Sequence, residues 1–237
     1  MFPDKLPLDT TAVFNSWSRH YPYISSYEYP YDYLQHAFFV NQMQKERRQS
    51  SKQPLFYYVR FFHAASGHEN VDIYINGKMI FKAFSFKQLS PYLTFAAGLY
   101  RIEIYPAGTQ EFPLIIKEIR LQNGAYITVA LSGIKEEIQL NSYVDQAQFI
   151  LPISVIRFLH LSKGSPAIDV NIKGGVTLFN RISYQNASNF LSFVPMTATL
   201  ELRESNTKRL ISAFPNITFK PDQSHTIAWV ENDLKML

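Results

Sequence analysis

The sequence predicts an all-β protein in which two tandem antiparallel β-sandwich domains follow an aromatic-rich N-terminal arm. Three observations predict this class. One pattern of residues occurs twice along the chain, apolar side chains alternate at period two within each copy, and turn residues separate the alternating runs. Charged residues make up 18% of the chain, which is low for a helical protein and ordinary for a β-rich one.

The repeat consists of matching segments at an almost constant separation. Residues 59–63 match residues 156–160, and residues 71–75 match residues 168–172 at the same separation. One residue is then inserted near Gly175, and the new register holds as far as residues 128–130 and 226–228. An internal repeat of this length indicates two copies of one domain. We therefore divide the chain into an arm over 1–54, a first copy over 55–151 and a divergent second copy over 152–237.

Strand and turn signals alternate within each copy. Residues 71–75 and 100–104 place apolar side chains at every second position, as a half-buried strand requires. Asn76-Gly77 follows the first of these runs and predicts a type I′ hairpin, because that turn needs positive φ at both central residues. Lys173-Gly174-Gly175 stands in the same place in the second copy. Short strands at this spacing are typical of a β-sandwich, here expected to be Ig-like or transthyretin-like.

The first copy resembles the domain of unknown function 4397 family. The strings VRFFHAASGHENVDIYINGKMIFKAFSF and SPYLTFAAGLYRIEIYPAGT carry the resemblance. They match nearly all of the family pattern R-x-x-H-A-S, V-D-V-Y-V-N-G, Y-x-x-x-x-x-G-x-Y and P-A-G-T. The matching residues are Arg60, His63, Ala64, Asp72, Asn76, Gly77, Tyr92, Gly98, Tyr100, Pro106 and Gly108.

The second copy keeps only part of this pattern. It retains Arg157, His160, Asp169 and Gly174 but has Asn206 in place of Gly108. The resemblance implies tandem β-sandwiches, which are frequent in bacterial envelope proteins, and it implies no established chemistry.

The arm is rich in aromatic residues and belongs to neither copy. Prolines among its tyrosines favour extended structure, whereas residues 32–49 have a helical composition and predict a short helix. Tyrosine suits interfaces because it offers a large amphipathic surface at modest entropic cost. We expect the arm either to pack on its own domains or to mediate self-association. The candidate interaction residues are Trp17, Tyr21, Tyr23, Tyr27, Tyr29, Tyr31 and Tyr33.

Three polar residues recur in both copies and are the candidate site residues. Buried polar groups need partners, so we interpret the recurrence as a structural polar network rather than a catalytic site. It comprises Arg60, His63 and Asp72 in the first copy and Arg157, His160 and Asp169 in the second.

The same region holds the densest group of metal-ligand residue types. His63, His68, Glu69 and Asp72 include two histidines and two carboxylates, but Ser165 and Pro166 replace His68 and Glu69 in the second copy. No nucleophile elbow, P-loop, dinucleotide fingerprint or paired-histidine helix occurs in the sequence, and it has no cysteine. We expect no enzyme, no metal and no cofactor.

Charge and hydropathy exclude further classes of function. The formal net charge of +4 is small for 237 residues, and the basic residues form no extended run, so we expect no nucleic-acid partner. No apolar stretch predicts a signal peptide or a transmembrane segment. We therefore expect synthesis in the cytoplasm, with deposition on the spore or cell surface.

These expectations leave three hypotheses open. The leading one is a non-catalytic structural or protein-interaction protein of the bacterial cell or spore surface, with self-association or a protein partner through the arm. The second is a carbohydrate- or peptidoglycan-binding module in which Tyr74, Tyr92 and Tyr105 stack on sugars. The third is a metal-dependent enzyme.

Overall fold

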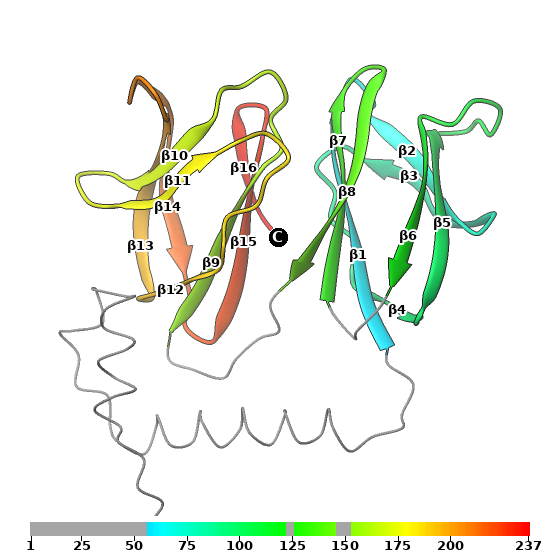
Figure 1. The fold of residues 1–237 in the computed structure, drawn as a ribbon, viewed down its shortest axis with the longest axis horizontal. Coiled ribbons are helices and arrows are strands. Elements are labelled where there is room, and N and C mark those ends of the chain that lie inside the picture. Colours follow the sequence, from blue (N-terminus) through cyan, green and yellow to red (C-terminus); the bar gives the residue numbers. More distant parts are fainter. Residues whose placement is uncertain (1–55, 122–125, 146–152) are drawn as a thin grey trace, which may run out of the picture.

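The computed structural model describes residues 56–121, 126–145 and 153–237, which form two β-sandwiches side by side (Figure 1). Sixteen strands and no helix are present in these ranges. Strands β1 to β8 build the first copy and strands β9 to β16 build the second. The predicted all-β class is confirmed.

Each copy consists of two four-stranded sheets with the same strand order. The first copy has sheets β4-β1-β7-β8 and β3-β2-β5-β6, and the second has β12-β9-β15-β16 and β11-β10-β13-β14. Every strand of one copy thus has a counterpart in the other, which is the topology that the repeat predicts. The strands of the first copy are β1 (Phe56–Ser66), β2 (Asn70–Ile75), β3 (Lys78–Ser85), β4 (Leu93–Ala96), β5 (Gly98–Pro106), β6 (Ile115–Leu121), β7 (Tyr126–Ile134) and β8 (Glu137–Asp145). Those of the second copy are β9 (Ser154–His160), β10 (Ile168–Ile172), β11 (Thr177–Ile182), β12 (Leu191–Phe193), β13 (Met196–Glu204), β14 (Leu210–Phe219), β15 (Gln223–Val230) and β16 (Asp233–Met236).

The prediction of purely antiparallel sheets is wrong at one pair in each copy. Strand β1 runs parallel to β7, and β9 runs parallel to β15. Alternating apolar residues mark a strand with one buried face, but the alternation is the same whichever way the neighbouring strand runs. The sheets that contain these pairs are therefore mixed.

Apolar side chains from both sheets meet inside each copy. Tyr57, Val59 and Phe61 of β1 pack against Val71 and Ile73 of β2 in the first copy. The second copy has its own core, in which Trp229 is the largest fully buried side chain. Each copy therefore has a hydrophobic core of its own.

The hairpin between β2 and β3 has the predicted turn. Asn76 has φ 50° and Gly77 has φ 76°, so both central residues lie in the left-handed region. The side-chain Oδ1 of Asn76 also accepts a hydrogen bond of 2.8 Å from the backbone N–H of Arg101 on β5. The type I′ prediction is confirmed.

We expect Asn76→Val to lower the free energy of unfolding by about 1–3 kcal/mol, because a β-branched residue is strained at positive φ. The denaturation midpoint of purified protein measures the loss. Lys78→Val, an exposed substitution two residues later, is the control and is expected to stay within about 0.5 kcal/mol. Equal midpoints for Asn76→Val and the unchanged chain would contradict the expectation.

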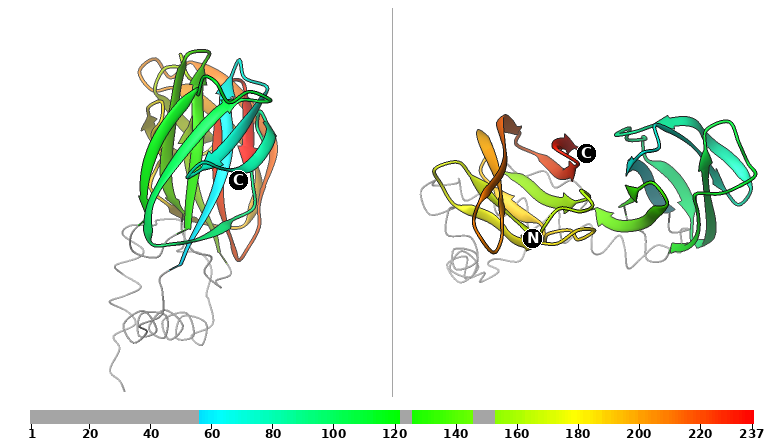
Figure 2. Two further views of the ribbon diagram at one scale, coloured as in Figure 1. Left: turned by 90° about the vertical axis from the view of Figure 1, so that its right-hand side faces the viewer. Right: turned by 90° about the horizontal axis from the view of Figure 1, so that it is seen from above.

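The two copies meet through the outer faces of the sheets that hold the parallel pairs (Figures 1 and 2). The interface is built from equivalent positions on both sides. Phe62 and Ala64 of β1 meet Leu159 and Leu161, which occupy the same positions in β9 and just after it. Tyr143 of β8 adds a hydrogen bond of 2.9 Å, which its hydroxyl donates to the carbonyl oxygen of Gln185.

The N-terminal arm, with its predicted helix and its aromatic residues, lies outside the described residues, as does the junction over 146–152. Within the described part of the chain, no helix is long and apolar enough to cross a membrane.

Candidate functional site

A buried cluster of charged side chains lies where the two copies meet, and its centre is Asp145. Asp145 is the last residue of β8, and its side chain is only 5% exposed. Its Oδ2 accepts a hydrogen bond of 2.6 Å from the Thr128 hydroxyl and one of 2.7 Å from the Tyr92 hydroxyl. Asp145, Thr128 and Tyr92 all belong to the first copy.

Arg157 of the second copy reaches across the interface to this carboxylate. Its Nη2 donates to Oδ1 of Asp145, and its Nη1 donates a hydrogen bond of 2.7 Å to the carbonyl oxygen of Val144. Its Nε donates to the Thr226 hydroxyl over 2.9 Å within its own copy. Arg157 therefore ties the end of β8 to the centre of the second copy's mixed sheet.

Arg60 is the counterpart of Arg157 in the first copy and lies beside the same carboxylate. Its Nε donates a hydrogen bond of 2.9 Å to the Thr128 hydroxyl and lies 3.6 Å from Oδ2 of Asp145. Its guanidinium carbon lies 4.7 Å from the centroid of the Tyr92 ring. Each arginine thus combines a threonine hydroxyl with a stacked aromatic ring, which for Arg157 is Phe190 at 4.8 Å.

Burial sets the protonation states of the cluster. It raises the pKa of Tyr92 well above its usual range, and the adjacent Asp145 carboxylate raises it further, so the phenol remains a hydrogen-bond donor. Burial also lowers the pKa of Arg157 from its ordinary value, and Asp145 opposes that effect. The hydrogen bonds of Tyr92 and Arg157 thus converge on the Asp145 carboxylate from the two copies.

The predicted polar network is divided among separate places. Asp72 accepts hydrogen bonds from the backbone N–H of Ala83 and of Gly108, and thereby holds β3 and the turn after β5. Asp169 of the second copy likewise accepts a hydrogen bond from the backbone N–H of Arg181. Ala83 and Arg181 have φ of 49° and 50°, so the two aspartates fix the same irregular strand in each copy. Among the described residues, no hydrogen bond joins Asp72 to Arg60 or His63.

His63 lies in β1 and His160 is the last residue of β9, each three residues after the arginine of its copy. Nδ1 of His63 accepts a hydrogen bond of 3.3 Å from the backbone N–H of Ala65, and its Nε2 is buried with no partner among the described residues. Burial lowers the pKa of His63 to about 4, and it also lowers the pKa of His160. Both rings therefore stay neutral at neutral pH.

These two histidines make folding stability depend on pH. An unfolded histidine takes up a proton below about pH 6.5, whereas folded His63 stays neutral until about pH 4. The unfolded state therefore binds more protons in this window, and stability falls as the pH falls through it. We expect His63 to account for a loss of up to about 3 kcal/mol between these pH values.

Denaturation curves at a series of pH values between 7 and about 4 measure this dependence. His63→Asn is expected to make the slope shallower, and His160→Asn is expected to remove a further share. A slope that neither substitution changes would contradict the assignment.

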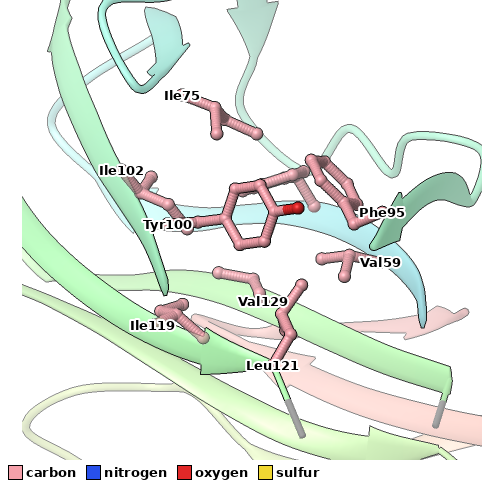
Figure 3. A pocket seen from close by; sticks show the side chains of 9 residues that line it. Val59, Ile75, Phe95, Tyr100, Ile102, Ile119, Leu121 and Val129 are labelled. Carbon is pink, nitrogen blue, oxygen red and sulfur yellow. The ribbon is translucent and has the colours of Figure 1, made fainter. Parts of the chain in front are cut away.

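A small cavity lies inside the first sandwich. It has a volume of about 10 Å³ and is lined by Tyr100, Phe95, Val59 and other apolar side chains (Figure 3). A space of this size holds at most about one water molecule.

A larger groove of about 450 Å³ lies between the two copies, and Ser66 at the end of β1 is part of its lining. Ala64 and Leu161 line it, together with serines and with Lys163, which forms an ion pair with Glu137 of the first copy. No aromatic side chain lines the groove, so it lacks the stacking surface that a sugar site typically uses.

Two of the three tyrosines considered for sugar stacking do not face solvent. Tyr74 and Tyr105 are each 7% exposed and pack edge to face at 5.4 Å, while the Tyr92 hydroxyl is bound to Asp145. Tyr74 and Tyr105 therefore do not form the exposed row of rings that the carbohydrate-binding hypothesis requires. Between residue 56 and the C-terminus, the described positions include no group of three His, Asp or Glu side chains that could hold a metal ion.

One family model and several solved structures are similar to parts of this chain. A family model described as "Domain of unknown function (DUF4397)" matches residues 57–151, and no curated protein matches the chain. One similar solved structure is the CBM26 module CBMbc from Eubacterium rectale Amy13K with maltoheptaose, at 8% identity and a TM-score of 0.24, covering 77% of this chain and 96% of that one. Another is the Bacillus anthracis TIE protein, at 9% identity and a TM-score of 0.25, covering 76% of this chain and 35% of that one. At these TM-scores neither likeness carries an argument about function.

Proposed function

Since residues 57–151 belong to the domain of unknown function 4397 family, we propose that the chain is a non-catalytic structural or protein-interaction protein of the bacterial cell or spore surface. The buried Arg157–Asp145 ion pair is the observation that carries the proposal. It joins the two copies into one unit, and both of its charged side chains are buried.

Further contacts support a structural role for the interface. The Tyr184 hydroxyl of the second copy donates to the Ser132 hydroxyl over 3.3 Å, and Lys87 of the first copy pairs with Asp233 at 3.2 Å. Polar contacts thus surround the apolar centre formed by Phe62 and Leu159. A two-domain unit of this kind offers a fixed surface to partners, and the aromatic arm supplies a further surface for association.

The test is the location of a fluorescent fusion of the full chain, followed through growth and sporulation in the bacterium that makes it. We expect fluorescence at the cell periphery or around the spore. Fluorescence spread evenly through the cytoplasm at every stage would overturn the surface assignment.

A further inference from the structure

The interdomain cluster has more positive than negative charge. Two guanidinium groups, Arg60 and Arg157, share the single carboxylate of Asp145, and their side chains are only 11% and 3% exposed. Tyr92 does not supply the missing charge, because its pKa is raised and its phenol is neutral. Charges withdrawn from water require compensation, so among the described residues this cluster has one unmatched positive charge.

The unmatched charge is at Arg60. Its counterpart Arg157 uses all three nitrogens, on Thr226, Val144 and Asp145. Arg60 uses Nε on Thr128, and no described residue accepts a hydrogen bond from its Nη1 or Nη2. In the second copy, the guanidinium of Arg157 thus binds a carboxylate and a carbonyl oxygen at the end of the strand β8. Arg60 has the same donors available for a similar partner.

Aromatic side chains lie beside Arg60 on the outer face of the sheet. Phe56, Tyr58 and Arg60 alternate along β1 and so share the outer face of the sheet. Tyr58 stacks on Tyr126 at 4.6 Å, and Tyr126 meets Tyr92 edge to face at 5.2 Å. Phe56 and Tyr126 remain 49% and 37% exposed. This surface suits a carboxylate that has aromatic side chains on both sides.

We propose that Arg60 and these rings bind the acidic tyrosine segment of the chain's own arm, residues 27–33, through the carboxylate of Glu28 or Asp32. The segment reads YEYPYDY, so each acid has a tyrosine on both sides. The other acids of the arm, Asp4, Asp9 and Glu46, have none beside them. The inference rests on the proposed role of the arm in association and names the surface that receives it.

Charge and reach both favour this occupant. A carboxylate at Arg60 balances the cluster and pairs with a guanidinium that already lies against an aromatic ring. The chain between residue 33 and Phe56 can extend to about 75 Å, at roughly 3.3 Å per residue, so it reaches Arg60 of its own chain or of a second copy.

Disulfide trapping tests the proposal in the full chain, which contains no cysteine of its own. One cysteine replaces Pro30, between the two acids, and the other replaces the exposed Thr94, which pairs with Tyr58 across β4 and β1. The pair Pro30→Cys and Thr94→Cys leaves the acids, the tyrosines and Arg60 intact. Two control pairs are matched to it: Pro7→Cys with Thr94→Cys, and Pro30→Cys with Glu118→Cys on the exposed face of β6.

We expect the test pair to cross-link about tenfold faster than either control, because docking raises the local concentration of the two thiols. Arg60→Gln, or Glu28→Gln with Asp32→Asn, is expected to bring the rate down to that of the controls. A non-reducing gel distinguishes a link within one chain from a link between two chains, and either supports docking. Equal rates for all pairs, or a fast rate that Arg60→Gln leaves unchanged, would overturn the proposal. Neither result depends on where the fusion protein localises, so this proposal and the proposed function fail separately.

Discussion

Replacing Asp145 with alanine is expected to lower the free energy of unfolding by about 3–5 kcal/mol. The change leaves Arg157 buried without its carboxylate, and breaking a buried ion pair by removing one partner typically costs this much. It also removes the acceptor of the Thr128 and Tyr92 hydroxyls. The free energy of unfolding from chemical denaturation measures the loss.

The matched control for Asp145 is Asp233, which also forms an ion pair between the two copies. Asp233 is 58% exposed, and its contact with Lys87 is open to water. We expect Asp233→Ala to cost less than about 1 kcal/mol, since exposed pairs contribute little. Similar losses for the two substitutions would show that the buried cluster does not stabilise the fold.

Gly133→Ala is expected to be the second large effect, at about 3 kcal/mol or more. Gly133 lies in β7 with φ 129°, and an added Cβ would stand 2.0 Å from the carbonyl oxygen of Glu137. The obstacle is backbone, so the turn between β7 and β8 must move to admit one methyl group. The cost combines backbone strain with the displacement of that turn.

Gly164 separates the two contributions because it also has positive φ, at 82°, but has no atom within 4 Å of an added Cβ. Gly164→Ala is therefore expected to show the backbone strain alone, at about 1–2 kcal/mol. Thermal unfolding of both variants measures the difference. Equal stability of the Gly133→Ala and Gly164→Ala proteins would contradict this expectation. It would mean that the β7–β8 turn moves to admit the methyl group at little cost in free energy.

The repeat made much of the fold predictable. A constant separation between copies predicts equal topology, and the Asn76-Gly77 turn was evident because only a few residues tolerate positive φ at both positions. The parallel pairs were not predictable, because period-two alternation reports a buried face and not the direction of the neighbouring strand.

The candidate site was predictable only in part. Arg60 and Arg157 stood out because they recur, and the matching Thr128 and Thr226 lie inside the repeated pattern. Asp145 carried no such signal, because it lies outside the segments that recur. A residue that serves both copies has no repeated counterpart, so a search for recurrence misses it. The grouping of Arg60 with His63 and Asp72 also relied on nearness in sequence, whereas the structure sends alternate side chains to opposite faces of a strand.

The parallel pairing of β1 with β7 and of β9 with β15 has a consequence for synthesis. The first strand of each copy cannot form hydrogen bonds with its parallel neighbour until the seventh strand of that copy has left the ribosome. Until then, one edge of the first strand has unpaired backbone groups. In the first copy β7 and β8 emerge before β9, and domains generally fold as units from the N-terminus. Asp145 is then already in place when Arg157 emerges. The earlier domain therefore serves as the surface on which the later, more divergent one assembles.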